Sequence, residues 1–282
     1  MAEDFMRDID AETAMAFYVI DEKMKEQGRS CSDSGIPSPA SVPYSFESKI
    51  INTEEELRIG QEMYAMFNQD QRSAADAILA SHRKQSTTAA GSCFFIDGPG
   101  GIGKNYLYNT LYHLFMGKGV HVMTVAWTGI AASLLPEGRT VHSRFRLPVP
   151  ILKTSTSGIR SNSKEAEEIR KTQVFIWDEA PMAPSYALNA VDILLRDIMN
   201  IDAPFGGKIM ILDGDFRQVL PVIRFANRSE LTAASLKSSN LWSYFRVMHL
   251  HQNMRTGPRE EEFSKWLIKL GNEDDEIELP RS

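Results

Sequence analysis

Short apolar runs alternate with longer amphipathic stretches along most of the chain. The runs predict buried strands and the amphipathic stretches predict helices. Alternation of the two predicts an α/β fold, with a mostly parallel sheet and helices on both faces. The predicted strands lie at 93–96, 120–126, 173–178, 208–213 and 246–250, and the clearest helices at 106–115 and 184–200 and after Asn68, which is a plausible N-cap.

The first 66 residues have a weaker pattern than the rest. Residues 11–25 and 54–66 carry apolar side chains at helical spacing, and residues 28–43 are rich in Ser, Gly and Pro. We therefore expect residues 1–66 to form a helical and loop extension that precedes the main domain. A further amphipathic stretch, 260–270, predicts a helix near the end of the chain.

A glycine-rich loop joins the first predicted strand to the next helix. Strand, loop and helix in this order are the context in which a phosphate-binding P-loop is credible. Backbone N–H groups of such a loop and of the helix start bind phosphate oxygens, and a lysine reaches the terminal phosphates. The predicted phosphate-binding residues are Gly98, Pro99, Gly100, Gly101, Ile102, Gly103 and Lys104.

Asn105 departs from the P-loop pattern. This position normally carries Ser or Thr, whose hydroxyl binds the Mg²⁺ ion that bridges the phosphates. The Asn amide oxygen sits on a longer, planar arm, whereas Mg²⁺ requires short bonds in octahedral geometry. The sequence therefore supports ATP binding, while Asn105 as a metal ligand requires a shift of the loop.

Two adjacent acids, Asp178 and Glu179, end the third predicted strand. In P-loop enzymes an Asp at such a strand end holds Mg²⁺, and a following Glu can act as general base on the attacking water. Adjacent acids are common as exposed charges, so the pair gains its meaning from the upstream P-loop.

Other polar residues near strand ends carry less information when each is considered alone. The Gln71 amide can bind both the donor and the acceptor edges of adenine, because it offers a donor and an acceptor itself. A solvated glutamine at a helix start explains this residue equally well. Thr128, His142 and Ser143 suit phosphate contacts to a nucleic-acid strand, and Phe145 suits base stacking; ordinary capping and core packing explain them as well.

Gln218 and Arg255 are candidates for sensing the γ-phosphate. Gln218 lies in a polar turn after the fourth predicted strand, where Arg217 can bind a phosphate or a neighbouring carboxylate. Arg255 follows the fifth predicted strand, from which an arginine can reach across a cleft. A polar turn and a solvated charge are the simpler explanations.

Composition places few further limits on function. The net charge of −6 argues against a strongly basic surface but permits a local basic groove. Cys31 and Cys93, the two cysteines, give neither a disulfide framework nor metal-ligand spacing. There is no membrane-spanning apolar run or secretory signal, so we expect no membrane partner. Because the cysteines give no disulfide framework, we expect a reducing compartment, the cytosol or the nucleus.

The ordered set of motifs resembles the Pif-one family of superfamily-one DNA helicases, which is related to RecD. The resemblance covers most of the chain from residue 11, and residues 28–39 are similar to the segment before the helicase of Helitron-type transposons. The matching segments are 68–72, 98–104, 128–132, 140–145, 177–182, 214–218 and 253–255.

The resemblance implies an ATP-dependent 5′ to 3′ DNA helicase that acts on single-stranded DNA and duplex junctions. It implies ATP and Mg²⁺ as cofactors, roles in repair, recombination, telomere maintenance or transposition, and a nuclear location, or a cytoplasmic one for a prokaryotic or viral copy. It also divides the chain into the 1–66 extension, a first RecA-like domain at 67–252 and the start of a truncated second at 253–282.

The same resemblance assigns roles to single residues. Gln71 would read adenine, Asp178 would serve magnesium and Glu179 the water. Gln218 would couple the nucleotide state to DNA, and Arg255 would reach the γ-phosphate. The residues that would line the DNA path are Thr128, His142, Ser143 and Phe145.

Two departures from the family pattern lead to a second hypothesis. Asn105 replaces the hydroxyl, and the later motifs of the second domain have no counterpart. We predict a helicase by descent whose activity these departures impair; the alternative is a catalytically weak module that binds nucleotide and single strands. A P-loop kinase or GTPase is disfavoured because no guanine-reading Asn-Lys-x-Asp is present.

Overall fold

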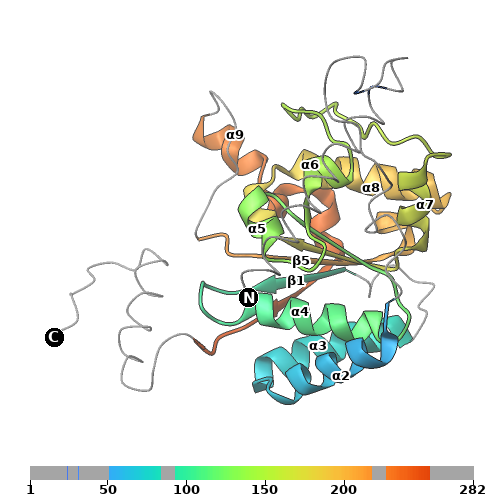
Figure 1. Ribbon diagram of the computed structural model, residues 1–282. Helices are drawn as coiled ribbons and strands as arrows, with labels where there is room; N and C mark the ends of the chain where they lie inside the picture. The colour runs from blue at the N-terminus through green and yellow to red at the C-terminus, as the bar shows by residue number, and fades with distance from the viewer. Residues whose placement is uncertain (1–23, 25–30, 32–50, 84–92, 218–226, 255–282) are drawn as a thin grey trace, which may run out of the picture. The chain divides into compact units, whose positions relative to one another are not determined.

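The computed structural model describes residues 24, 31, 51–83, 93–217 and 227–254 of the 282 in the chain. It contains two compact units, Met1–Ile51 and Asn52–Ser282. In the first unit, the described residues Met24 and Cys31 place their sulfur atoms 3.9 Å apart. The predicted helix at 260–270 and most of the one at 11–25 lie outside the described residues. The second unit contains the sheet (Figure 1).

A parallel sheet forms the centre of this unit, in the order β3-β2-β4-β5-β1-β6. The predicted α/β class is thus confirmed. Sequence analysis found each strand except the two-residue β3. The strands are β1 (Cys93–Asp97), β2 (Val122–Ala126), β3 (Arg139–Thr140), β4 (Val174–Asp178), β5 (Ile209–Gly214) and β6 (Phe245–His249).

Helices cover both faces of the sheet (Figure 1). The longer ones are α2 (Thr53–Ala65), α3 (Gln69–Arg83), α4 (Lys104–Met116), α7 (Lys164–Lys171) and α8 (Ser185–Met199). Shorter ones are α5 (Gly129–Ser133), α6 (Val141–Arg144) and α9 (Arg228–Ala233), with 3₁₀ turns η3 (Ala180–Met182), η4 (Pro204–Gly207), η5 (Leu236–Ser238) and η6 (Asn240–Tyr244). Among the described residues, no helix has the length and hydrophobicity needed to cross a membrane.

Alternating side chains of the central strands fill two separate cores. Phe95, Trp177 and Leu212 face α7 and α8, whereas Phe94, Ile176 and Ile211 face α3 and α4. A strand buried on both faces reads as a continuous apolar run, which explains why these strands are visible in the sequence. Each apolar side chain removed from water stabilises the fold by about 1.5–3 kcal/mol.

Helix α2 packs closely on α4, although the sequence assigned it to the extension that ends at residue 66. A Cβ atom added to Gly60 of α2 would lie 2.8 Å from the backbone nitrogen of Leu114. The Glu56 carboxylate contacts His113 Nδ1 at 2.6 Å across the same interface. Helix α2 therefore belongs to the same compact unit as the sheet, and the boundary lies between residues 51 and 52 rather than after residue 66.

We expect Gly60→Ala to lower the free energy of unfolding by about 1 kcal/mol. Alanine is the better helix former by about 1 kcal/mol, but its methyl group would meet backbone that cannot move alone, and such overpacking costs about 1–3 kcal/mol. Denaturant unfolding measures the change. Gly129→Ala is the matched control, because nothing lies within 4 Å of its added Cβ. Equal or greater stability of Gly60→Ala would contradict the close approach.

Candidate functional site

The candidate site lies where the parallel strands end. β1 leads into the loop Gly98–Gly103, and the loop leads into α4. Gly103 is the N-cap of α4 with a left-handed φ of 79°, and no side chain caps this helix end. Its first N–H groups therefore remain available to an anion, as a P-loop requires.

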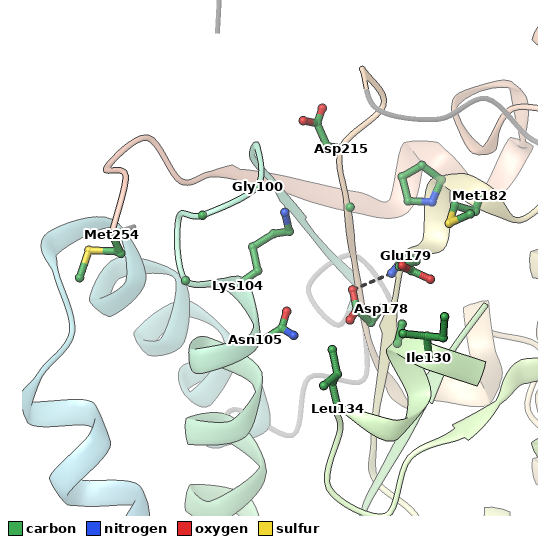
Figure 2. A pocket seen from close by; sticks show the side chains of 15 residues that line it. Gly100, Lys104, Asn105, Ile130, Leu134, Asp178, Glu179, Met182, Asp215 and Met254 are labelled. Carbon is green, nitrogen blue, oxygen red and sulfur yellow. Dashed lines mark hydrogen bonds between the residues drawn. The ribbon is translucent and has the colours of Figure 1, made fainter. Parts of the chain in front are cut away.

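The Lys104 side chain lies across the loop that precedes it (Figure 2). Its Nζ atom donates hydrogen bonds to the carbonyl oxygens of Gly98 and Pro99, at 2.7 and 3.2 Å. The ammonium group is thus held at the mouth of the loop, where it can reach an anion that binds there.

Gln71 supports the loop from α3. Its side chain is buried, and Nε2 donates to the carbonyl oxygens of Gly103 and Ile102 at 3.3 and 3.4 Å. Oε1 accepts the backbone N–H of Asn68, whose side chain caps α3 as predicted. Both ends of the amide therefore contact backbone in this structure, and adenine recognition by Gln71 stays a prediction.

The predicted acid pair lies at the end of β4, across the cleft from the P-loop (Figure 2). Asp178 is buried, and its Oδ1 accepts the backbone N–H of Glu179 at 2.7 Å. Glu179 has a left-handed φ of 55°, and its Oε2 accepts the hydroxyl proton of Thr128 at 2.7 Å. Thr128 follows β2 and caps α5, accepting the Ala131 N–H at 3.2 Å.

Asp213 is a third carboxylate that the sequence analysis did not single out. It lies on β5, is 1% exposed, and its Oδ1 also accepts the Glu179 N–H, at 3.2 Å. The hydroxyl of Tyr108 on α4 donates to its other oxygen. Burial and the adjacent Asp178 raise the pKa of Asp213 well above its ordinary value. The only available signal was its position at the end of an apolar strand.

The P-loop and the acid pair border one cleft with a volume of about 790 Å³. Its polar groups come from the P-loop, from Asp178 and Glu179 at the end of β4, and from Asp215 after β5. Ile130, Leu134 and Met182 add apolar side chains beside the two acids, on the side of the cleft that faces the P-loop (Figure 2). The polar lining includes Gly100, Gly101, Gly103, Lys104, Asn105, Asp178, Glu179 and Asp215.

The described part of the chain contains oxygen ligands suited to Mg²⁺. The amide of Asn105 and the carboxylate of Asp178 border the same cleft, and hard cations prefer oxygen donors. No cluster of three or more His, Cys, Asp or Glu residues suited to a metal ion occurs among the described residues. A sparse set fits an ion that keeps several waters and binds substrate phosphates.

The residues predicted to line the DNA path fall into two groups. Thr128, His142 and Ser143 lie near the ends of β2 and β3, and the His142 ring packs on Trp127 with centroids 4.6 Å apart. Burial lowers the pKa of His142. Ser143 is exposed, and its backbone N–H donates to the Thr140 side chain at 3.2 Å.

The structure corrects the role predicted for Phe145. Its side chain is 0% exposed and packs against Phe175 of β4, with ring centroids 6.0 Å apart. A ring enclosed in the core cannot stack on a base, so core packing is the correct explanation for this residue.

Gln218 and Arg255 lie outside the described residues, and their predicted roles remain predictions. Arg217, which precedes Gln218, donates from Nε to Asp215 Oδ1 at 2.7 Å. Of the two partners expected for Arg217, the structure therefore shows the neighbouring carboxylate.

Comparison with known proteins agrees with this arrangement. The family model described as PIF1-like helicase matches residues 66–278, which is more than half of the chain. The chain belongs to the PIF1-like helicase family. The family that the sequence motifs resemble is thereby confirmed.

Two relatives and one solved structure show the extent of the similarity. ATP-dependent DNA helicase Pif1 of Psychrobacter sp. (strain PRwf-1) is 30% identical over 174 residues, covering 61% of this chain and 26% of the relative. ATP-dependent DNA helicase PIF1 of Emericella nidulans is 29% identical over 202 residues, covering 68% of this chain and 26% of the relative. The crystal structure of Pif1 helicase from Bacteroides in complex with ADP-AlF3 and ssDNA is 25% identical and has a TM-score of 0.59. The match covers 73% of this chain and 46% of the chain in that structure.

The PIF1-like chain spans only part of these proteins. It covers about a quarter of the two curated relatives and just under half of the solved chain. The match thus concerns the part of a PIF1-like helicase that contains the P-loop, the acid pair and the sheet between them.

We expect Asp213→Asn to raise the free energy of unfolding at neutral pH by about 1–2 kcal/mol. Asp213 and Asp178 converge on one N–H donor in a buried position, and the Asp213 carboxyl must take up a proton to fold there, a cost that the neutral amide avoids. Chemical denaturation measures the change. Asp192→Asn is the matched control: it is also buried, but its carboxylate pairs with Arg196 at 2.9 Å, so stability falls by about 1–3 kcal/mol.

The gain from Asp213→Asn depends on pH with a definite sign. A carboxyl whose pKa is raised by folding must take up a proton to fold, and this cost is present above the pKa of the unfolded chain, about 3.9. The difference between Asp213→Asn and the parent therefore shrinks as pH falls toward about 4. A difference that grows on acidification would contradict a carboxyl buried in its neutral form.

Proposed function

We propose that this chain is the nucleotide-binding part of an ATP-dependent DNA helicase, in which ATP hydrolysis drives 5′ to 3′ movement on single-stranded DNA and unwinding of duplex ahead. The observation that carries the proposal is the convergence of Lys104, Asn105, Asp178 and Glu179 on one cleft. Membership of the PIF1-like family supports the same conclusion.

Each group in the cleft has a chemical role that its position supports. The loop N–H groups and Lys104 bind the phosphates of ATP. Glu179 orients the attacking water and accepts its proton. Asn105 and Asp178 would hold Mg²⁺, which supplies charge neutralisation on the phosphate oxygens when it is bound. Gln71, Gln218 and Arg255 keep the roles expected for adenine, nucleotide sensing and the γ-phosphate.

The DNA-binding part of the proposal concerns the ends of β2 and β3. Thr128, His142 and Ser143 offer hydroxyl and imidazole groups to a phosphate backbone, and Phe145 takes no part. A solved structure that is 25% identical concerns DNA unwinding at forked duplex DNA by two coordinating Pif1 helicases. By analogy we propose single-stranded DNA and duplex junctions as partners, with roles in repair, recombination, telomere maintenance or transposition in the nucleus or cytoplasm.

Asn105 favours a second candidate function, a module that binds nucleotide and single strands with little hydrolysis. Phosphate binding depends on the loop backbone and Lys104, whereas hydrolysis also needs a correctly placed metal. Replacing the usual hydroxyl therefore impairs catalysis more than binding. The two candidates differ in turnover at equal nucleotide affinity.

We expect Asn105→Thr to raise single-strand-stimulated ATP hydrolysis by on the order of ten- to a hundredfold over the unaltered chain. The gain appears in kcat, because the hydroxyl restores a metal ligand without changing the phosphate-binding loop. A phosphate-release assay with and without oligonucleotide, in MgATP, measures it.

The control is Lys104→Ala in the Asn105→Thr background, which removes a phosphate contact and abolishes the gain. Equal turnover by the unaltered chain and Asn105→Thr would show that Asn105 is compatible with catalysis. Tight binding of a fluorescent ADP analogue without turnover in either protein identifies the binding module. Absence of both binding and turnover contradicts the proposal.

A further inference from the structure

The hydroxyl of Thr128 holds the carboxylate of Glu179. The donor Oγ1 and the acceptor Oε2 are 2.7 Å apart. Thr128 follows β2 and Glu179 follows β4, and these strands are neighbours in which Ala126 pairs with Asp178. The register of the sheet therefore places the two side chains side by side. In Figure 2 the Glu179 carboxylate points away from Lys104, on the other side of Asp178.

Two buried carboxylates, Asp178 and Asp213, hold the backbone of Glu179. Its φ is 55°, and its N–H donates to Asp178 Oδ1 at 2.7 Å and to Asp213 Oδ1 at 3.2 Å. Asp213 is in turn held by the hydroxyl of Tyr108. Because the backbone is fixed in this way, only rotation of the side chain can change what the Glu179 carboxylate contacts.

The Thr128 hydroxyl can donate one hydrogen bond, and Glu179 accepts it. The oxygen of the same hydroxyl accepts the N–H of Ala131 at 3.2 Å. Phosphate oxygens are acceptors, so a nucleic-acid backbone that contacts this hydroxyl competes with Glu179 for one proton. The nearby carboxylates use other donors: Asp215 has Arg217, and Asp213 has Tyr108.

We propose that Thr128 keeps Glu179 in a resting position, and that single-stranded DNA, by accepting the Thr128 hydrogen bond in place of Glu179, releases the carboxylate to the nucleotide cleft. This inference rests on the proposed function, because it assumes that Thr128 lies on the DNA path. It adds a positioning role for Thr128 and a reason why hydrolysis would depend on DNA. Binding at the end of β2 would alter the chemistry at the end of β4 through one hydrogen bond.

Linkage makes the proposal testable without any turnover. If DNA must break the bond between Thr128 and Glu179, then removing the Glu179 carboxylate removes that cost from DNA binding. A hydrogen bond to a charged group is worth about tenfold or more in an equilibrium constant. We therefore expect Glu179→Ala to bind single-stranded DNA about tenfold more tightly than the unaltered chain.

The experiment is fluorescence anisotropy with a labelled oligothymidylate, on the full chain, without nucleotide and at one fixed salt concentration. Glu179→Asp separates the bond from the charge: it keeps the charge but its shorter arm cannot reach Thr128. We expect it to show most of the gain. Thr128→Ser keeps the hydroxyl, so Glu179→Ala should retain its tenfold effect in that background.

A double-mutant cycle with Thr128→Val completes the test. In this background the bond is already absent, so Glu179→Ala should change the DNA affinity only by its small general charge effect. Glu179→Asp at an intact Thr128 provides the same information if loss of the α5 cap unfolds Thr128→Val. Gains of equal size in both backgrounds, or no gain in Glu179→Asp, would overturn the inference while leaving the proposed function intact. Absence of oligonucleotide binding in all of these proteins would overturn both.

Discussion

All strands of a parallel sheet end at the same edge, and this constraint determines where the chemistry of the chain can lie. β1, β2, β4 and β5 deliver the P-loop, Thr128, Asp178 and Asp213 to one edge, although more than a hundred residues separate the first from the last. No long-range side-chain contact is needed to bring them there, because backbone pairing between neighbouring strands does so. A one-residue change of register between β2 and β4 would separate Thr128 from Glu179 and would exchange the two faces of a strand that is buried on both.

Grouping acids at one edge has an energetic consequence. Asp192 and Asp215, which are also buried, each have an arginine partner. Asp178 and Asp213 instead share the N–H of Glu179, and the additional donor to Asp213 is a neutral phenol. This arrangement lowers stability but fixes the backbone of Glu179 in a left-handed conformation that a non-glycine residue rarely adopts. Preorganised sites commonly keep such strain because the surrounding structure enforces it.

The parts of the site that were predictable from sequence are those encoded within one strand and its following turn. The P-loop and the Asp178-Glu179 pair could be recognised because a buried strand reads as an apolar run and its polar end is then conspicuous. Asp213 ends a strand in the same way but belongs to no familiar pattern, so only the structure shows that it faces Asp178. The role predicted for Phe145 is wrong because an aromatic residue after polar positions has the same sequence pattern whether it stacks on a base or packs against Phe175 in the core. The packing of α2 on α4 was not predictable for a related reason. It depends on Gly60, which allows the two helices to approach closely because it has no side chain.

In the proposed function, nucleotide binding and hydrolysis depend on different atoms of this cleft. One substitution can therefore lower the rate of hydrolysis and leave nucleotide affinity unchanged. The proposed phosphate site consists of backbone N–H groups and Lys104, and neither of these depends on the Asn105 side chain. The proposed hydrolysis depends on the placement of a metal ligand and of the Glu179 carboxylate. Asn105 replaces the hydroxyl of the usual pattern, and Glu179 accepts a hydrogen bond from Thr128. The first difference is permanent, whereas the second is a hydrogen bond that a competing acceptor can replace. A chain with this cleft is therefore expected to retain nucleotide affinity under conditions in which its hydrolysis is limited by residues 105 and 179.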